Sequence, residues 1–322
     1  QGRGIADFAR EFYNEGGRVL LIDQVFKHPE WSPELRKCYD MYPNLKIVFT
    51  GSSVMRLKEE NPELNNIVKS YNLRGFSFRE FLNLKTGNHF RPYTLDEILR
   101  NHERIVKDIL PKVSPLSFFQ DYLHHGFYPF FQEQRNYSEN LLKTMNMVTE
   151  VDILLIKQIE LKYLTKIKKL FYLLALEGNK APNVSWLAQE IETSRATVMN
   201  YIKYLADARL INMIYPKGCE FPKKPSKVMM HNTNLMYAIY PIAVKRQDVM
   251  ETFFVNTMWK DHNVNQGAKD DFYLVDGSLK FKICNANDFE KKKFRQDTIY
   301  ARYNTEVGND NLIPLWLLGF LY

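Results

Sequence analysis

With 322 residues, 45% of them hydrophobic and 14% aromatic, the chain can bury two or three small cores, which excludes a mostly disordered protein. Its net charge of +7 is too modest for a dedicated polyanion binder, although lysine and arginine are denser between Lys157 and Lys227 than elsewhere. No apolar run approaches the ~18 residues that span a bilayer, and the three cysteines show no CxxC spacing. We therefore expect a cytoplasmic protein with no membrane partner.

The first part of the chain has the pattern of a strand, a helix and a second strand. The apolar run Val19–Ile22 ends in Asp23, and a run without alternation is typical of a parallel strand covered on both faces. A helix capped by Ser32 is predicted to end near Tyr42, and a second apolar strand follows over Lys46–Phe49. The order predicts a βαβ unit of a parallel sheet.

Polar residues follow both predicted strands. Asp23 and Gln24 come after the first strand, and Thr50 and Ser52 come after the second. Because ligands bind where the carboxyl ends of parallel strands emerge, we expect these four side chains to share one crevice. The residues alone also allow a simpler interpretation, in which Asp23 ends an ordinary strand and Thr50 and Ser52 form a turn.

The string LLIDQVFKHPEWSPELRKCYDMYPNLKIVFTGSS resembles the Walker B region of a prokaryotic ATPase family with an AAA+-like core and a C-terminal domain of unknown function. The resemblance implies that Asp23 binds ATP-associated Mg²⁺ through water, that position 24 polarises the attacking water, and that Thr50 and Ser52 belong to the sensor region. Gln24 can hydrogen-bond to water but cannot accept its proton. Losing a general base costs about 10²- to 10⁴-fold in rate, so Gln24 predicts a hydrolysis-deficient site, either natural or an engineered Glu→Gln trap.

Two parts of the family pattern are missing. The chain has no phosphate-binding GxxxxGK[ST] segment, so we expect the ATPase domain to begin upstream of the first residue and these residues alone to bind ATP poorly. Asn66 and Ile67 stand where the family commonly has an arginine pair that could act on a neighbouring subunit of a homo-oligomer. The arginines that could substitute are Arg56, Arg74 and Arg79.

Helical patterns dominate the middle of the chain. Capping boxes at Ser77 and Thr94 predict two helices of a helical lid over residues 76–164. A winged helix-turn-helix is predicted over residues 165–230, because three helical segments are followed by two strands. The segments are 166–176, 184–191, 195–207, 210–215 and 227–230.

The predicted winged helix is a candidate for binding double-stranded DNA. In that case its third helix enters the major groove by its amino end, and the wing contacts phosphates. The DNA-binding candidates are Arg195, Thr197, Asn200 and Lys203 on the helix, and Lys223, Lys224 and Lys227 in the wing. A protein contact or a rigid spacer is an equal alternative, in which the basic charge is a solvated face.

Residues 231–322 resemble the degenerate PD-(D/E)xK nuclease-like domain of the same ATPase family. Asp271 matches the aspartate of that motif, whereas Lys282 and Cys284 stand where its acid and lysine are expected. A hard cation would lose a carboxylate ligand there, so we do not expect nuclease activity. The apolar ending 313–322 resembles the terminal strand of the family.

These features predict an α/β protein in which residues 1–75 form the carboxyl-terminal half of a parallel-sheet, AAA+-like P-loop ATPase core. The lid, the winged helix-turn-helix and a small α/β nuclease-like domain follow. The predicted function is that of an oligomeric ATPase that binds ATP and Mg²⁺, hydrolyses poorly because of Gln24, and couples nucleotide state to DNA or a protein partner. The alternative is a non-enzymatic DNA-binding or scaffold protein derived from such an ATPase.

Overall fold

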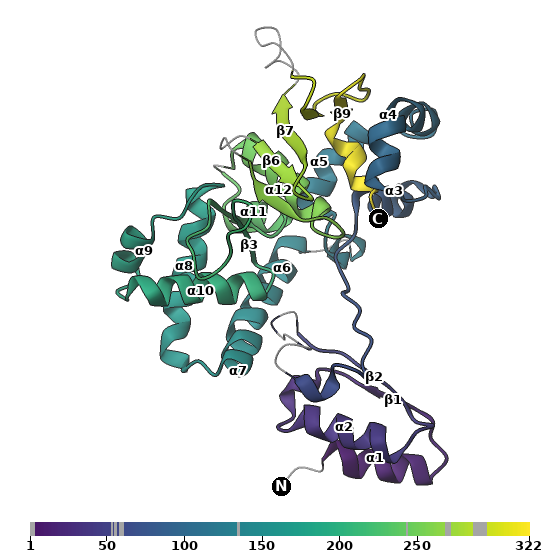
Figure 1. The fold of residues 1–322 in the computed structure, drawn as a ribbon, viewed down its shortest axis with the longest axis vertical. Coiled ribbons are helices and arrows are strands. Elements are labelled where there is room, and N and C mark those ends of the chain that lie inside the picture. Colours follow the sequence, from purple (N-terminus) through teal and green to yellow (C-terminus); the bar gives the residue numbers. More distant parts are fainter. Residues whose placement is uncertain are drawn as a thin grey trace.

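The computed structural model describes residues 4–52, 54, 57, 61–133, 136–242, 244–267, 272–285 and 295–322. A small amino-terminal unit and a larger body are joined by an extended linker around residues 69–75 (Figure 1). None of the helices in these described ranges is long and apolar enough to cross a membrane.

The amino-terminal unit is a two-stranded parallel sheet with two helices packed on it. Strand β1 (Val19–Ile22) pairs with β2 (Lys46–Phe49), and helix α1 (Ile5–Asn14) packs against α2 (Trp31–Met41). The predicted βαβ order is therefore present. A separate small core unites this unit and consists of Ala9, Leu20, Cys38 and Leu45.

Two expectations about this unit are wrong. Ser32 lies inside α2 instead of capping it, and its hydroxyl donates a hydrogen bond to the carboxylate of Glu63. The strands are covered on one face only, since Leu20 is buried whereas Leu21 is 72% exposed. Side chains alternate between the faces of a strand, and among the described residues nothing covers the second apolar face.

Helices make up most of the larger body. In chain order they are α3 (Phe78–Thr86), α4 (Leu95–Ile109), α5 (Pro115–His125), α6 (Tyr137–Met147), a π-helical stretch (Val148–Ile153), α7 (Leu154–Lys157), α8 (Leu164–Glu177), α9 (Val184–Glu190), α10 (Arg195–Asp207), α11 (Thr233–Ile239) and α12 (Arg246–Met258). Capping boxes begin α3 at Ser77 and α4 at Thr94, as predicted.

The position of α3, α4 and α5 differs from that of a lid over the amino-terminal sheet. These helices pack against the carboxyl-terminal 3-10 segment Leu315–Phe320, at the end of the body far from β1 and β2 (Figure 1). Phe78 of α3 shows the packing: its ring centroid lies 5.0 Å from that of Phe119 and 6.3 Å from that of Phe320.

Two sheets complete the body. Strand β3 (Ile211–Ile214) pairs antiparallel with β4 (Lys227–Met230), directly after α8, α9 and α10, so these elements follow the predicted order. The second sheet has the strand order β5-β6-β7-β8-β9, antiparallel from β5 to β7 and parallel from β7 to β9. Its strands are β5 (Val264–Gln266), β6 (Phe272–Val275), β7 (Leu279–Asn285), β8 (Ile299–Tyr303) and β9 (Leu312–Pro314).

The apolar end of the chain is mostly helical. The terminal strand expected over residues 313–322 is limited to β9, because Leu315–Phe320 forms a 3-10 helix in which Trp316 and Phe320 are buried. One continuous core extends from these residues through the helices and β3 and β4. The segments predicted as lid, winged helix and nuclease-like domain therefore share a core.

Candidate functional site

The carboxyl ends of β1 and β2 bring three of the predicted site residues together. The Thr50 hydroxyl donates a hydrogen bond to Oδ1 of Asp23, and its oxygen accepts one from the backbone N–H of Gln24 at 2.9 Å. The parallel pairing of the strands positions this cluster, since the Thr50 N–H donates to the carbonyl of Ile22 at 2.9 Å. The geometry is that of two polar strand ends meeting at one edge of a sheet.

The Asp23 carboxylate is exposed and partly free. Within the described part of the chain, Thr50 is its side-chain hydrogen-bond partner, and this bond goes to Oδ1 and not to Oδ2. No group of three or more metal-ligating side chains occurs among the described residues. Asp23 therefore fits a hard cation held through water, with other ligands supplied by phosphate oxygens.

Gln24 has an unusual backbone conformation for a residue with a side chain. Its φ of 55° and ψ of 53° lie in the left-handed region, directly before the 3-10 turn Val25–Lys27. Its side-chain amide makes no hydrogen bond within the described ranges. The amide is therefore available to orient a water molecule beside Asp23, which an amide can do without accepting a proton.

Ser52 does not join this cluster. Its hydroxyl donates to Oδ2 of Asp152 at 2.5 Å, so it joins the amino-terminal unit to the π-helical stretch of the body. Burial raises the pKa of Asp152, while the hydrogen bond from Ser52 and the charge of Lys27 oppose that rise. Asp23, Gln24 and Thr50 thus lie together as expected, whereas the expectation that Ser52 joins them is wrong.

Of the three arginines considered as substitutes for an arginine finger, Arg74 and Arg79 lie away from this edge. Arg56 is outside the described residues. Arg79 donates through Nε to the carbonyl of Tyr322 at 2.8 Å, and Arg74 donates to the carbonyl of Asn256 at 2.8 Å. Both side chains are thus held within the larger body.

Two of the four DNA-binding candidates on helix α10 are exposed. Ser194 caps the helix as predicted, and Arg195 and Asn200 are exposed near its amino end. The Thr197 hydroxyl lies 2.9 Å from that of Ser194 and takes part in the cap. Lys203 forms an ion pair with Asp207 at 2.6 Å, so a DNA phosphate would have to compete with a carboxylate.

The three wing lysines have different environments. Lys223 and Lys224 are exposed in the loop between β3 and β4. Lys227 is 7% exposed, and its Nζ lies 3.0 Å from Oε2 of Glu251 and 3.2 Å from the hydroxyl of Tyr273. The prediction that Lys227 contacts a DNA phosphate is therefore wrong. The sequence offered one signal, the apolar run that directly follows this lysine in β4.

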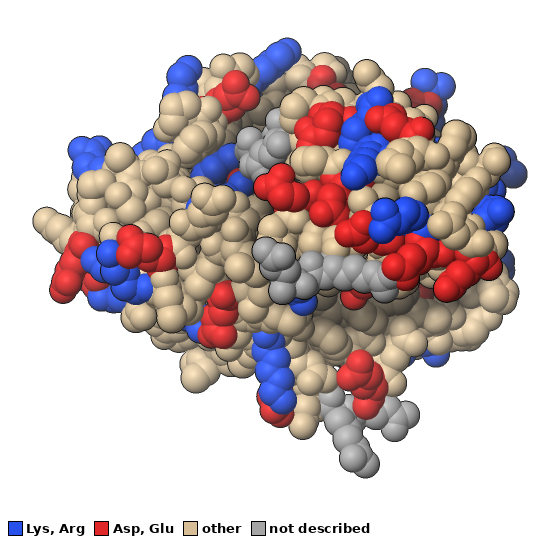
Figure 2. Space-filling model, turned by 90° about the horizontal axis from the view of Figure 1, so that it is seen from below, with Lys and Arg blue, Asp and Glu red and all other residues tan. Residues whose placement is uncertain are grey.

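The surface charge is mixed on the face that Figure 2 shows. Lysine and arginine side chains there lie among aspartates and glutamates, as expected for a solvated surface. The same mixture occurs near α10, where Lys169 forms an ion pair with Glu190 at 3.4 Å.

The nuclease-like motif does not form a cation site in the described residues. Asp271 lies outside them. Lys282 of β7 holds its Nζ 5.0 Å from the ring centroid of Phe272, and Cys284 is buried with Tyr300. Glu251 of α12 forms an ion pair with Lys227.

Comparisons with known proteins match two separate parts of the chain. Residues 3–82 match the family model of an AAA domain, and residues 117–243 match a domain of unknown function (DUF8612). An uncharacterized protein of Methanocaldococcus jannaschii is 28% identical over 206 residues, which are 62% of this chain and 43% of that relative. The chain thus aligns with less than half the length of this relative. No solved structure matches the chain. The amino-terminal unit is AAA-like, which indicates a nucleotide-binding ATPase domain.

Proposed function

We propose that the amino-terminal unit contributes the Walker B edge of an ATPase that binds ATP and Mg²⁺, and that Gln24 makes hydrolysis slow. The observation that carries this proposal is the cluster of Asp23, Gln24 and Thr50 at the ends of two parallel strands, inside the segment that matches an AAA domain. Polar groups at this edge of a parallel sheet are where such folds bind nucleotides.

Each residue of the cluster has a distinct role in this proposal. The Thr50 hydroxyl fixes the orientation of the Asp23 carboxylate, whose second oxygen then binds the water shell of Mg²⁺. The bound cation would neutralise charge on the phosphates. Gln24 orients the attacking water through its amide, and the missing carboxylate leaves the proton of that water without an acceptor. These residues make up the metal and water side of the site only, since the chain has no GxxxxGK[ST] segment.

The output of the nucleotide state is proposed to lie in the larger body. The hydrogen bond between Ser52 and Asp152 connects the strand end after β2 to the helices that precede α8. A shift of that strand end on nucleotide exchange would therefore act on the helix-turn-helix region in an oligomer. Double-stranded DNA is the proposed partner, contacted by Arg195, Asn200 and the two exposed wing lysines, with a protein partner as the alternative.

The experiment is a comparison of ATP turnover at saturating Mg²⁺ in the full-length protein and three variants. Gln24→Glu should hydrolyse ATP at least about tenfold faster, because the carboxylate restores a proton acceptor. Asp23→Asn should weaken Mg²⁺-dependent ATP binding, whereas Asp40→Asn, the same chemical change on the exposed surface of α2, should have no effect. Equal turnover with Gln and Glu at position 24 would contradict the assignment.

The second candidate function is a DNA-binding or scaffold protein without turnover. Gln24 itself and the absence of an arginine pair at Asn66 and Ile67 favour it. In that case Gln24→Glu would stay inactive while DNA binding persisted without nucleotide. Nucleotide-dependent binding of either partner would exclude this candidate.

A further inference from the structure

A small cavity lies where the linker meets the helical body. Its volume is about 200 Å³, and its walls come from the linker, α6, the end of α10 and the residue after β4. Most of the lining is apolar, including Phe127, Leu141 and Met145. The volume is below the ~300 to 1,000 Å³ of pockets for larger ligands, so the cavity suits a small molecule.

Two arginines line this cavity without a carboxylate partner. Arg74 donates through Nη2 to the carbonyl of Asn256 at 2.8 Å, but its Nε is buried and has no hydrogen-bond partner in the structure. The Arg209 guanidinium forms no hydrogen bond or ion pair with the described residues. Arg74 also lies over the ring of Tyr322, 5.8 Å from its centroid. Both arginines are half-buried and lack a negative counter-charge in the part of the chain that the structure describes, and removing such charges from water is costly.

The charges of these arginines reinforce one another. Burial lowers the pKa of Arg209, and the charge of Arg74 lowers it further. Burial, followed by the charges of Arg74 and Arg209, lowers the pKa of His231 to about 3, so its imidazole is neutral. The cavity therefore has a net positive potential that an anion would relieve.

Arg209 also occupies a backbone position that normally belongs to glycine. Its φ is 55°, and it follows α10 in a Schellman motif, with Arg209 N–H donating to the Ala206 carbonyl and Leu210 N–H to that of Leu205, each at 3.0 Å. A side chain in this conformation costs roughly 1 kcal/mol relative to glycine.

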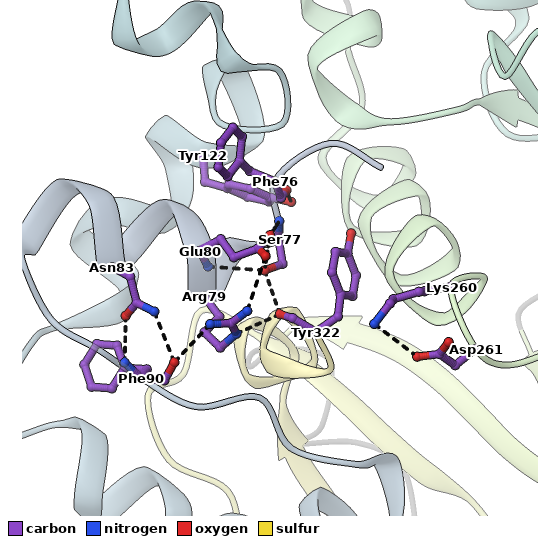
Figure 3. A network of polar contacts seen from close by, with 10 residues as sticks. All are labelled: Phe76, Ser77, Arg79, Glu80, Asn83, Phe90, Tyr122, Lys260, Asp261 and Tyr322. Carbon is purple, nitrogen blue, oxygen red and sulfur yellow. Dashed lines mark hydrogen bonds and ion pairs between the residues drawn. The ribbon is translucent and has the colours of Figure 1, made fainter. Parts of the chain in front are cut away.

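Close contacts hold the end of the linker that carries Arg74. A Cβ at Gly75 would lie 2.4 Å from the carbonyl oxygen of Phe127, so the linker approaches that loop closely. Figure 3 shows that the residues after the linker are held at the carboxyl end of the chain, where Ser77 and Arg79 donate to the carbonyl of Tyr322 at 2.7 and 2.8 Å. The cavity is thus largely formed before any ligand binds.

We propose that this cavity binds a small phosphate monoester, with the phosphate between Arg74 and Arg209 and a compact apolar body against the aromatic and aliphatic wall. A phosphate dianion matches two guanidinium groups, each of which can donate paired hydrogen bonds to oxyanions. Bound there, it would fasten the linker to the corner between α10 and β3. This site goes beyond the proposed ATPase function and does not depend on it.

The test is calorimetric titration of the chain at constant ionic strength with phenyl phosphate, inorganic phosphate and benzoate. Phenyl phosphate should bind more tightly than inorganic phosphate, because its ring contacts the apolar wall. Arg74→Gln and Arg209→Gly should each weaken its binding about tenfold or more, since each removes charge-assisted hydrogen bonds. Arg100→Gln, which removes an exposed arginine of α4, is the matched control and should bind normally.

The Arg209→Gly variant distinguishes a loss of ligand binding from a loss of folding. Glycine adopts a positive φ without strain, so this variant should unfold at a temperature no lower than that of the unchanged protein while it loses phenyl phosphate binding. Absence of phenyl phosphate binding to the unchanged chain, or equal affinity in Arg209→Gly, would overturn the proposal. Tighter binding of benzoate than of phenyl phosphate would overturn the assignment of the ligand as a phosphate.

Discussion

The buried ion pair between β4 and α12 provides the sharpest test of the structure. Lys227 and Glu251 are each 7% exposed, and their charged atoms lie 3.0 Å apart. The Glu251 carboxylate also accepts hydrogen bonds from the Tyr273 hydroxyl and from Nε2 of Gln247, the latter at 3.0 Å. Lys227 has Tyr273 as its other polar neighbour, at 3.2 Å. Apart from their contact with each other, Glu251 therefore has two hydrogen-bond partners and Lys227 has one.

Single substitutions should destabilise the protein by different amounts. Glu251→Gln removes the carboxylate that contacts the buried Lys227 and leaves only the more distant charge of Asp248 to act on it, so we expect a loss of about 3 to 5 kcal/mol in the free energy of unfolding. The upper limit is about 5 kcal/mol, the cost of deprotonating a lysine at pH 7. Lys227→Met leaves a carboxylate that keeps two donors and can protonate for about 4 kcal/mol, so we expect a smaller loss of about 2 to 4 kcal/mol.

The assay is urea unfolding at pH 7 of the unchanged protein, both single variants and the double variant Lys227→Met with Glu251→Leu. The double variant removes both charges, and it should cost less than the sum of the single variants by about 2 kcal/mol or more. Lys143→Met is the matched control, because Lys143 pairs with Glu139 at 2.6 Å on an exposed helix surface. It should change stability by less than about 0.5 kcal/mol.

A loss below about 0.5 kcal/mol for Lys227→Met would refute this reasoning, because it would place Lys227 in water. The wing would then present three lysines to a partner, as the sequence predicted. Additive single and double variants would likewise show that the two charges do not interact in the folded protein.

Three further predictions follow from other parts of the body. The pKa of His231 falls from 6.5 to about 3 on folding, so the stabilising effect of its neutral form is fully present above pH 6.5 and is lost as the pH falls toward 3. The free energy of unfolding measured with urea should therefore fall by up to about 1.4 kcal/mol per pH unit below 6.5. His231→Gln should remove this pH-dependent component, and an unchanged dependence on pH in that variant would contradict the prediction. Ser77→Ala should cost about 1 to 2 kcal/mol in thermal unfolding, because the hydroxyl caps α3 and also donates to the Tyr322 carbonyl, and a neutral result would argue against this buried cap. If the wing binds DNA, replacing Lys223 and Lys224 with Glu should flatten the salt dependence of binding measured by fluorescence anisotropy, by about 0.9 in the slope of log K against log salt for each lost phosphate contact, whereas unchanged binding would favour a protein partner.

Local features of the chain were predicted well because nearby residues carry them. The strand of Val19–Ile22 and the helix caps at Ser77, Thr94 and Ser194 depend on residues a few positions apart, and the structure confirms each of them. The pairing of β1 with β2 followed from the parallel βαβ order, and it brought Asp23 to Thr50 as expected.

Contacts between distant segments decided the rest. Lys227 was predicted to be exposed because a lysine in a basic loop usually is, but α12 places Glu251 beside it from 24 positions away along the chain. Ser52 likewise turns from the strand edge to Asp152, which lies 100 positions away. Periodicity reports which face of an element is apolar, but not which partner that face meets. Only the tertiary structure could show that Arg74 and Arg209 line one cavity, because nothing local links the linker to the end of α10.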